Sequence, residues 1–446
     1  MTALFDLDRL LSTDSAGPVA RRLPPAELAR LATAVREAAD AERLVKTENG
    51  RTAPYPMLAS LVQLTADAER HLARHVPLVV SAWRKVLLAH RTDARVRDFL
   101  AVPAALREWV DAAPIGDYRV DFCRFDLVGG DVETARVVEF NANCPGGVLF
   151  TSAYAALWRD VPAVREVLEE WGVARTRLDD RHWFPEFLRT AVGPECADGP
   201  FGIFHKTGGN VLELDKMTDL LAETGHSAVC VDPGSEDWLA RDLRAGYLKY
   251  GVQPVLADIA RWPAFLDRIS SGKLRIANPL AGRWIGDNKL CLALLSDPRF
   301  AGMFTAAERE AIERLIPYSR KVGDGVEPAD LLADRAGWVV KGPYDTRGNS
   351  VYVGSEQDED RWRAVVRRAA EDGWLAQRAV PAYRRDWQGT PCYQDLSIVL
   401  LDGAWAGYTS RISESLRVNV AQGGGRQVVF GHRDTDWGTG ERPPIA

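Results

Sequence analysis

The segment that decides the fold runs from Asp117 to Gly147 and reads DYRVDFCRFDLVGGDVETARVVEFNANCPGG. Within it, residues 118–127 and 135–141 have strand-like patterns, and a Gly-Gly-Asp turn lies between them. Two such runs joined by a glycine-containing turn predict an antiparallel hairpin. The hairpin also marks a change of pattern, because apolar residues recur at helical spacing before it and at strand spacing after it.

Four polar side chains of this hairpin are predicted to share one face. Side chains on a strand alternate between faces, so Arg124 lies with Asp126, and Glu139 lies with Asn141. The opposite face takes the apolar side chains Phe125, Val138 and Phe140. Two carboxylates and an amide oxygen suit Mg²⁺, and the arginine beside them suits a phosphate or carboxylate. The alternative is an ordinary exposed face of an antiparallel sheet.

Two lysines belong to a second group of candidate residues. Lys289 lies near the start of a predicted helix, and Lys341 ends a buried-strand pattern. After Lys341 comes a polar loop that contains Gly348 and Ser350, followed by a returning strand at 351–353. Such a loop can fold over a triphosphate with its backbone N–H groups, while a lysine reaches the phosphates. The alternative for each lysine alone is a solvated surface position.

Two later segments complete the candidate site. Residues 374–380 are typical of a strand that runs into a connector, where a hinge backbone next to Gln377 would contact adenine. A hairpin over residues 396–412 ends in Thr-Ser-Arg-Ile-Ser-Glu-Ser-Leu, which places Arg411 among small polar residues. An arginine there suits the stabilisation of charge in a transition state. The alternative is a surface ion pair with Glu414.

The order of these motifs resembles the synthetase domain of glutathionylspermidine synthase, a permuted ATP-grasp ligase. The likeness spans roughly residues 118–420, and joint occurrence in one order is more specific than any single motif. The matching residues are Arg124 and Asp126; Glu139, Asn141, Ala142 and Pro145; Trp284, Asn288 and Lys289; Lys341 and Gly348; Gln377; and Arg411, Glu414, Ser415 and Leu416. The resemblance implies an α+β fold of the permuted ATP-grasp type, with a helical N-terminal lobe and a small βαβ unit like a pre-ATP-grasp domain.

The resemblance also implies a role for each candidate residue. Magnesium would be held by Asp126, Glu139 and Asn141. ATP would be held by Lys289, Lys341, Gly348, Ser350 and Gln377. The catalytic residues Arg124 and Arg411 would stabilise the transferring phosphoryl group and the acyl phosphate. The implied activity is an ADP-forming carbon–nitrogen ligase that joins a carboxylate to an amine. A small-molecule kinase on the same scaffold and a non-catalytic nucleotide-binding protein stay open as alternatives.

The chain departs from the family pattern at one motif position. The family box usually reads Asn-Ala-Asp-Thr-Pro, whereas this chain has Asn143 in place of the acid. Loss of that acid removes a candidate partner for a cationic substrate and argues against a polyamine. Beyond Leu416 the comparison ends, so the roles of Asn419 and of the glycines at 423–425 stay open.

Length and pattern predict four regions. We expect a helical N-terminal lobe over residues 1–115, and the metal-binding hairpin with the helical part of the ATP-grasp core over 116–200. A βαβ substrate-side domain follows over 201–285. Residues 286–446 would form the ATP-binding lobes and a polar tail.

Composition narrows the range of partners. The 446 residues include 56 Lys+Arg and 62 Asp+Glu, a net charge of −6, which gives no reason to expect nucleic acid or an anionic membrane. Residues 1–11 lack the apolar core of a secretory signal, and six scattered cysteines fit reduced thiols. We therefore expect a cytoplasmic protein with small-molecule carboxylate and amine substrates. A homodimer is one option that the sequence leaves open.

Overall fold

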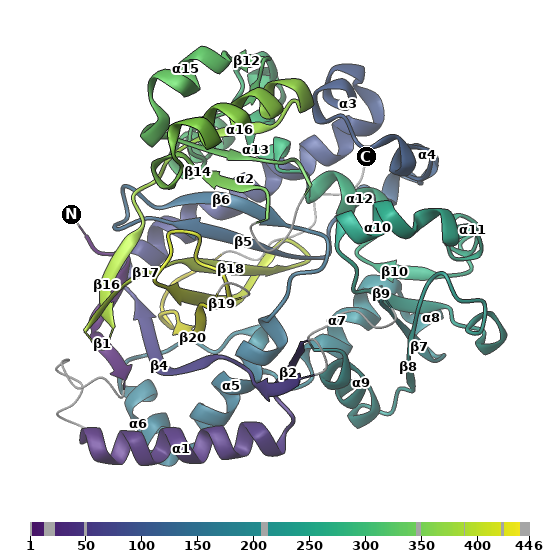
Figure 1. Cartoon of the computed structure of the whole chain (residues 1–446). Coiled ribbons are helices and arrows are strands. Elements are labelled where there is room, and N and C mark those ends of the chain that lie inside the picture. The colour runs from purple at the N-terminus through teal and green to yellow at the C-terminus, as the bar shows by residue number, and fades with distance from the viewer. Residues whose placement is uncertain are drawn as a thin grey trace.

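The computed structural model describes residues 2–12, 23–48, 51–206, 213–344, 349–387, 389–420 and 423–437. Its described strands form four sheets, and a nine-stranded sheet runs through the middle of the molecule (Figure 1). The main path of this sheet is β1-β4-β20-β19-β18-β5-β6, and the β16–β17 hairpin joins it through β19. The strands are β1 (Phe5–Ser12), β4 (Met57–Leu64), β5 (Phe122–Val128), β6 (Arg136–Asn141), β16 (Tyr383–Trp387), β17 (Thr390–Gln394), β18 (Leu396–Leu401), β19 (Ala404–Ser413) and β20 (Gly425–Phe430).

Three smaller sheets surround the central sheet. A parallel sheet contains β7 (Phe201–Phe204), β8 (Ala228–Val231), β9 (Ala245–Leu248) and β10 (Arg275–Ala277). A five-stranded sheet contains β11 (Ser319–Val322), β12 (Gly325–Val326), β13 (Trp338–Lys341), β14 (Val351–Val353) and β15 (Leu375–Arg378). A two-stranded sheet contains β2 (Val45–Glu48) and β3 (Arg51–Pro54). In Figure 1 the five-stranded sheet lies above the central sheet, and the parallel sheet lies to its right.

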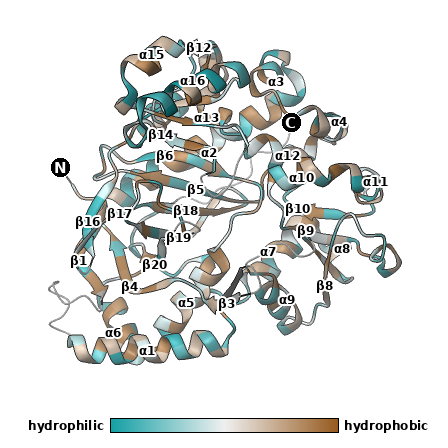
Figure 2. Ribbon diagram, in the orientation of Figure 1, coloured by the Kyte–Doolittle hydropathy of each residue, from teal (hydrophilic) through white to brown (hydrophobic). Residues whose placement is uncertain are grey.

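Helices cover these sheets and connect them. The N-terminal half contains α1 (Pro25–Ala41), α2 (Ala66–Thr92), α3 (Ala94–Leu100), α4 (Ala104–Ala112), α5 (Val148–Asp160), α6 (Pro162–Glu170), α7 (Trp183–Val192), α8 (Pro194–Ala197) and α9 (Leu214–Glu223). The C-terminal half contains α10 (Val252–Asp258), α11 (Pro263–Ser270), α12 (Leu280–Gly286), α13 (Leu290–Ser296), α14 (Ala306–Leu315), α15 (Pro328–Ala333) and α16 (Glu359–Asp372). Figure 2 shows hydrophilic and hydrophobic residues alternating along α1, whose buried side packs near α5.

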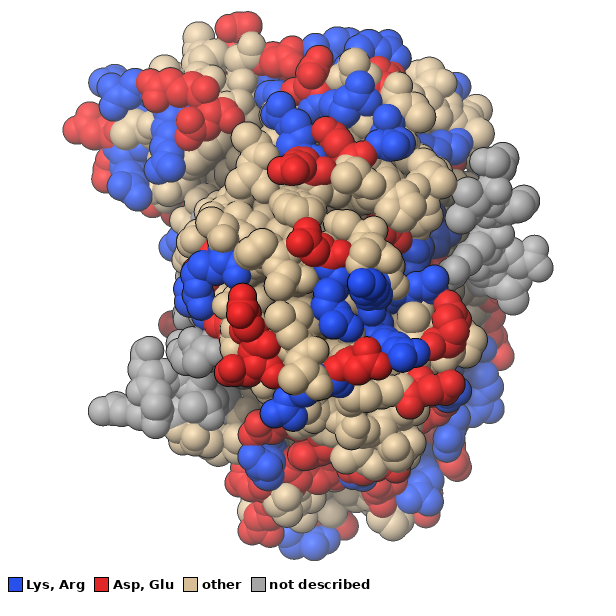
Figure 3. All heavy atoms as spheres, turned by 90° about the vertical axis from the view of Figure 1, so that its right-hand side faces the viewer, with Lys and Arg blue, Asp and Glu red and all other residues tan. Residues whose placement is uncertain are grey.

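Positive and negative side chains are mixed on the face shown in Figure 3. No single sign dominates the described residues there, so this face has no electrostatic footprint typical of nucleic-acid binding. The six cysteines are all free. Among the described residues, no helix combines the length and the apolar character needed to cross a bilayer.

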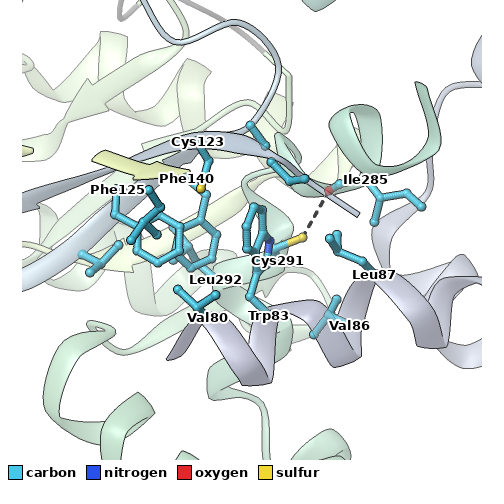
Figure 4. Close-up of a cluster of buried hydrophobic side chains, with 14 of the residues drawn as sticks. Val80, Trp83, Val86, Leu87, Cys123, Phe125, Phe140, Ile285, Cys291 and Leu292 are labelled. Atoms are coloured by element: carbon cyan, nitrogen blue, oxygen red, sulfur yellow. Dashed lines mark hydrogen bonds between the residues drawn. The ribbon is translucent and has the colours of Figure 1, made fainter. Parts of the chain in front are cut away.

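The predicted hairpin at residues 118–141 is confirmed as β5 and β6, which pair in antiparallel fashion. Its apolar face packs against α2, where Trp83 contacts Phe125 and Phe140 with ring centroids 5.6 and 5.2 Å away. Figure 4 shows these rings with Cys291 and Leu292 of α13 beside them. This packing directs the other face of the hairpin, which carries the polar side chains, away from α2.

The βαβ pattern within residues 201–285 is confirmed, because β7 and β8 pair in parallel and α9 connects them. The predicted helical N-terminal lobe over residues 1–115 contains strands as well as the helices α1 to α4. β4 lies inside the central sheet between β1 and β20, and the last five of its eight residues, 60–64, are all buried. Residues 60–64 read Ser-Leu-Val-Gln-Leu, which lacks the apolar–polar alternation that marks a strand with one exposed face. The first region therefore supplies strands to the central sheet.

Candidate active site

The polar face of the β5–β6 hairpin has the predicted arrangement. Arg124 lies directly opposite Asn141, and Asp126 lies directly opposite Glu139. The register then shifts by one residue, which is a β-bulge, and Val138 has no partner in the pairing. Val138 borders the cavity described below, so its predicted place on the apolar face is wrong.

Asp126 is the centre of a buried ionic network. Its carboxylate accepts hydrogen bonds from Nε and Nη2 of Arg124 at 2.6 and 2.9 Å, and from Nη2 of Arg411 at 2.8 Å. The hydroxyl of Ser397 donates a fourth bond at 2.9 Å. Burial acts to raise the pKa of Asp126, but the two guanidinium groups outweigh burial and hold the pKa well below its usual range. Arg411 thus forms its ion pair with the buried Asp126 and not, as in the alternative prediction, with Glu414 at the surface.

Asp395 is a site residue that the sequence reasoning missed. It is 2% exposed and accepts hydrogen bonds from the main-chain N–H of Arg411 at 2.6 Å and from its Nε at 2.7 Å. Arg411 is therefore held between two carboxylates, those of Asp126 and Asp395. The local signal in the sequence was an acid placed directly before the largely apolar strand β18, whose residues are all buried.

The two predicted lysines both reach the polar face of the hairpin. Lys289, directly before α13, forms an ion pair of 2.8 Å with Glu139. Lys341 ends β13, and its Nζ donates to the main-chain oxygen of Val138 at 2.7 Å and to Oε1 of Gln377 at 2.8 Å. Burial lowers the pKa of Lys341 to about 8, against the opposing attraction of Glu139. A buried ammonium with a lowered pKa is typical of functional sites.

The predicted phosphate loop is described at its two ends. Gly342 follows Lys341, and its N–H donates to the main-chain oxygen of Ser350 at 3.0 Å. Gly348 lies outside the described residues. The predicted connector after Gln377 is confirmed, because residues 379–382 lie between β15 and β16.

One cavity of about 420 Å³ lies among these elements. Five of the ten predicted site residues line it: Asp126, Glu139, Lys341, Gln377 and Arg411. Much of the remaining wall is apolar and consists of Val128, Val138, Val339, Val351, Val353, Val418 and residues 379–382. The volume is in the range of small-molecule sites, which are mostly apolar with a few convergent polar groups.

Four described residues of the predicted site do not line the cavity, namely Arg124, Asn141, Lys289 and Ser350, and two of them bind residues that do. Arg124 binds Asp126, and Lys289 binds Glu139. Asn141 donates from Nδ2 to the main-chain oxygen of Arg124 at 3.3 Å, which leaves its Oδ1 as the acceptor for a further partner. Asn419, whose role the sequence left open, borders the cavity.

The residues present fit a magnesium ion that shares its ligands with a phosphate group. Asp126 and Glu139 face each other, and the amide oxygen of Asn141 is the third hard donor on this face. No group of three or more His, Cys, Asp or Glu side chains among the described residues is placed to hold a metal. Mg²⁺ usually binds one or two carboxylates together with substrate phosphates and water, so a complete protein cage is not required.

Asn143 has a structural role in the described chain. It is 2% exposed, its Oδ1 accepts from Nε of Arg283 at 2.6 Å, and its Nδ2 donates to the main-chain oxygen of Tyr250 at 2.7 Å. Asp287 accepts the main-chain N–H of Asn143 at 3.1 Å. Asn143 does not line the cavity, and its side chain is occupied by Arg283 and Tyr250.

Comparison with known proteins places the fold. No family model matches the chain, and no curated protein matches it. Among solved structures, a glutathione synthetase-like effector (GSS30) from Globodera pallida, in its apo form, is similar over 90% of this chain and 96% of its own, at 13% identity and a TM-score of 0.53. At this identity the likeness concerns the fold alone. The chain thus has a mixed α/β fold similar to that of a glutathione synthetase-like protein, and the resemblance to glutathionylspermidine synthase stays a prediction.

Proposed function

We propose that the chain is an ATP- and magnesium-dependent ligase that joins a carboxylate to an amine through an acyl phosphate. The observation that carries this proposal is the convergence of Asp126, Glu139, Lys341, Gln377 and Arg411 on one cavity. These residues come from the β5–β6 hairpin and from strands β13, β15 and β19, which lie about 200 or more positions further along the chain. The similar fold of a glutathione synthetase-like protein favours a ligase of the ATP-grasp type.

The cavity suits a nucleotide at both its apolar and its polar parts. The valine-rich wall and the connector at 379–382 would bind the base, while Gln377 positions Lys341 by the bond to its Nζ. Lys341 and Lys289 would contact phosphate oxygens as point charges. Ser350 and the loop that contains Gly348 are proposed to close over the same phosphates. The order of motifs, with the metal hairpin before the nucleotide lysines, favours the permuted arrangement.

The polar face supplies what a two-step ligation needs. Asp126, Glu139 and Asn141 would hold Mg²⁺, which when bound draws charge from the phosphate oxygens. A substrate carboxylate oxygen bonds to the γ-phosphorus, and the bond from that phosphorus to the ADP oxygen breaks. The amine nitrogen then bonds to the carbonyl carbon, phosphate leaves, and the amine loses a proton to solvent. Arg124 and Arg411 neutralise the charge of the transferring group, so no covalent catalysis by the protein is required.

Hydroxylamine trapping tests this proposal. The full chain is incubated with ATP, Mg²⁺, hydroxylamine and a pooled library of small carboxylic acids, and the products are identified by mass spectrometry. We expect an acyl hydroxamate whose formation requires ATP and releases ADP. A product with a hydroxyl-linked phosphate would support the kinase alternative, and nucleotide binding without ADP release would support a non-catalytic protein.

A further inference from the structure

Arg426 is a buried cation that has no part in the function proposed so far. It lies on β20 directly opposite Arg411 of β19 and is 5% exposed. Its Nη2 donates to the main-chain oxygen of Gly146 at 2.9 Å. Its Nε and Nη1 have no hydrogen-bond partner within the described part of the chain. The hydroxyl of Tyr55 lies against this guanidinium, but it is a neutral group. A buried guanidinium that no described carboxylate pairs with is costly unless an anion binds there.

Positive charges outnumber negative charges around Arg426. Arg124 donates from Nη1 to the same Gly146 oxygen at 2.8 Å, so two guanidinium groups converge on one carbonyl. The nearby cations are Arg124, Arg411, Arg426 and Lys249, and the nearby carboxylates are Asp126, Asp395 and Glu213. Each of the three carboxylates is already paired with one or more of the other cations. The excess of one positive charge is therefore centred on Arg426.

Glycine permits the close approach of Arg426 to the loop that follows the metal hairpin. Gly147 has a φ of +77°, and a Cβ at this position would collide with the guanidinium of Arg426 and the hydroxyl of Tyr55. The loop from Gly146 thus brings the unused donors of Arg426 close to Arg124, which binds Asp126. An anion bound by Arg426 would lie next to the proposed metal and phosphoryl site.

The cations follow the order of strands in the central sheet. Lys341 contacts β6 at one edge, Arg124 lies on β5, Arg411 lies on β19, and Arg426 lies on β20 beyond them. We propose that Arg426 binds the carboxylate of the acid substrate, on the side of Arg411 away from the nucleotide lysines. This inference rests on the proposed ligase function for the identity of the anion as a carboxylic acid that becomes phosphorylated.

The test measures ligand-dependent shifts of the melting temperature of the full chain. The probes are N-acetylglycine as a simple carboxylate, inorganic phosphate, and ATP with Mg²⁺, each added alone. For the wild type we expect stabilisation by N-acetylglycine. For Arg426→Gln we expect an unchanged or higher melting temperature without ligand, because the unpaired charge is gone while an amide can still reach Gly146. The affinity of the Arg426→Gln variant for N-acetylglycine should fall at least about tenfold, and ATP should still raise its melting temperature.

Two further variants make the result specific. Arg426→Lys retains the charge and should keep a weakened carboxylate response, and the exposed Arg363→Gln on α16 should behave as the wild type. The inference is overturned if the wild type shows no carboxylate response, or if Arg426→Gln keeps it. Loss of the ATP or phosphate response alone in Arg426→Gln would make Arg426 a nucleotide ligand, which also overturns it. Failure of the proposed function would appear differently, as a wild type that does not respond to ATP with Mg²⁺.

Discussion

Arg411 on β19 donates a hydrogen bond of 2.8 Å to Asp126 on β5, across the intervening strand β18. The same guanidinium is bound by Asp395, which lies just before β18. An arginine that is bound by two carboxylates keeps one of these ion pairs when the other carboxylate binds a new partner. Under the proposed function, Arg411 would stay in place through Asp395 while Asp126 turns to the metal ion.

Arg411→Ala is therefore expected to impair the chemical step more than nucleotide binding. The charge that Arg411 would stabilise develops during phosphoryl transfer, and loss of such a group typically lowers kcat by about 10²–10³-fold. The affinity for ATP, measured by calorimetry, should change little. Loss of ATP binding with kcat preserved would make Arg411 a nucleotide ligand, and the catalytic role would pass to Arg124.

Asp395→Asn provides the matched control for this prediction. If Asp395 acts only by positioning Arg411, its substitution should lower kcat in the wild type and have no further effect in an Arg411→Ala background. Additive losses in the double variant would mean that Asp395 has a separate role. The exposed Arg363→Ala on α16 controls for the loss of one positive charge.

Glu139→Gln tests the magnesium assignment. The change removes one of the two facing carboxylate charges and keeps nearly the same shape, so the fold should persist while turnover falls strongly and the remaining turnover requires more Mg²⁺. Circular dichroism and the Mg²⁺ dependence of ADP release are the measurements. The exposed Glu313→Gln on α14 should leave both unchanged. Full activity of Glu139→Gln with an unaltered Mg²⁺ dependence would refute the assignment.

The parts of the site that could be predicted from the sequence depend on local geometry. Alternation along a strand and a glycine turn are enough to place Asp126 and Glu139 on one face, and a buried strand followed by a polar loop is enough to place Lys341 at a strand end. The bulge that moves Val138 to the cavity was not predictable in this way, because it adds one residue to an otherwise regular pattern.

The residues that were missed depend on contacts between distant segments. Arg426 bonds to Gly146, which is 280 positions away in the sequence, and nothing near Arg426 indicates that it is buried. The contacts of Asn143 were likewise not predictable, because its side chain binds Arg283, which is 140 positions away. The strand β4 was missed for a related reason, since burial on both faces removes the alternation that marks a strand.

Arg283→Met is expected to destabilise the fold. Arg283 is fully buried and donates to Oδ1 and the main-chain oxygen of Asn143 and to the main-chain oxygen of Leu248. The substitution leaves three buried acceptor oxygens without a donor. This loss should outweigh the gain from no longer burying a charge, and the free energy of unfolding should fall by about 3 kcal/mol. Thermal unfolding should show a melting temperature several degrees lower, and the exposed Arg363→Met should show none of this loss. An unchanged midpoint for Arg283→Met would exclude a structural role.

The lowered pKa of Lys341 predicts how nucleotide affinity depends on pH. Burial brings its pKa to about 8 in the folded chain, against 10.5 for an unperturbed lysine, so between these values the unfolded chain binds more protons than the folded chain. The contribution of Lys341 to folding stability therefore becomes more favourable as pH rises through this window. A contact with phosphate needs the protonated ammonium form of Lys341. The affinity for a phosphate group therefore decreases as pH rises, whereas folding stability increases.

ATP affinity should consequently fall as pH rises above about 8, with a slope that approaches tenfold per pH unit. Calorimetric titration of the wild type from pH 7 to about 9.5 measures this slope, and proton uptake on binding should appear in buffers of different ionisation enthalpy. Lys341→Arg retains its charge throughout this range, so its affinity should depend little on pH. Lys341→Ala should bind ATP weakly at every pH. If wild type and Lys341→Arg show the same pH profile, the phosphate contact belongs to another cation, and Lys289, which pairs with Glu139 at 2.8 Å, is the next to test.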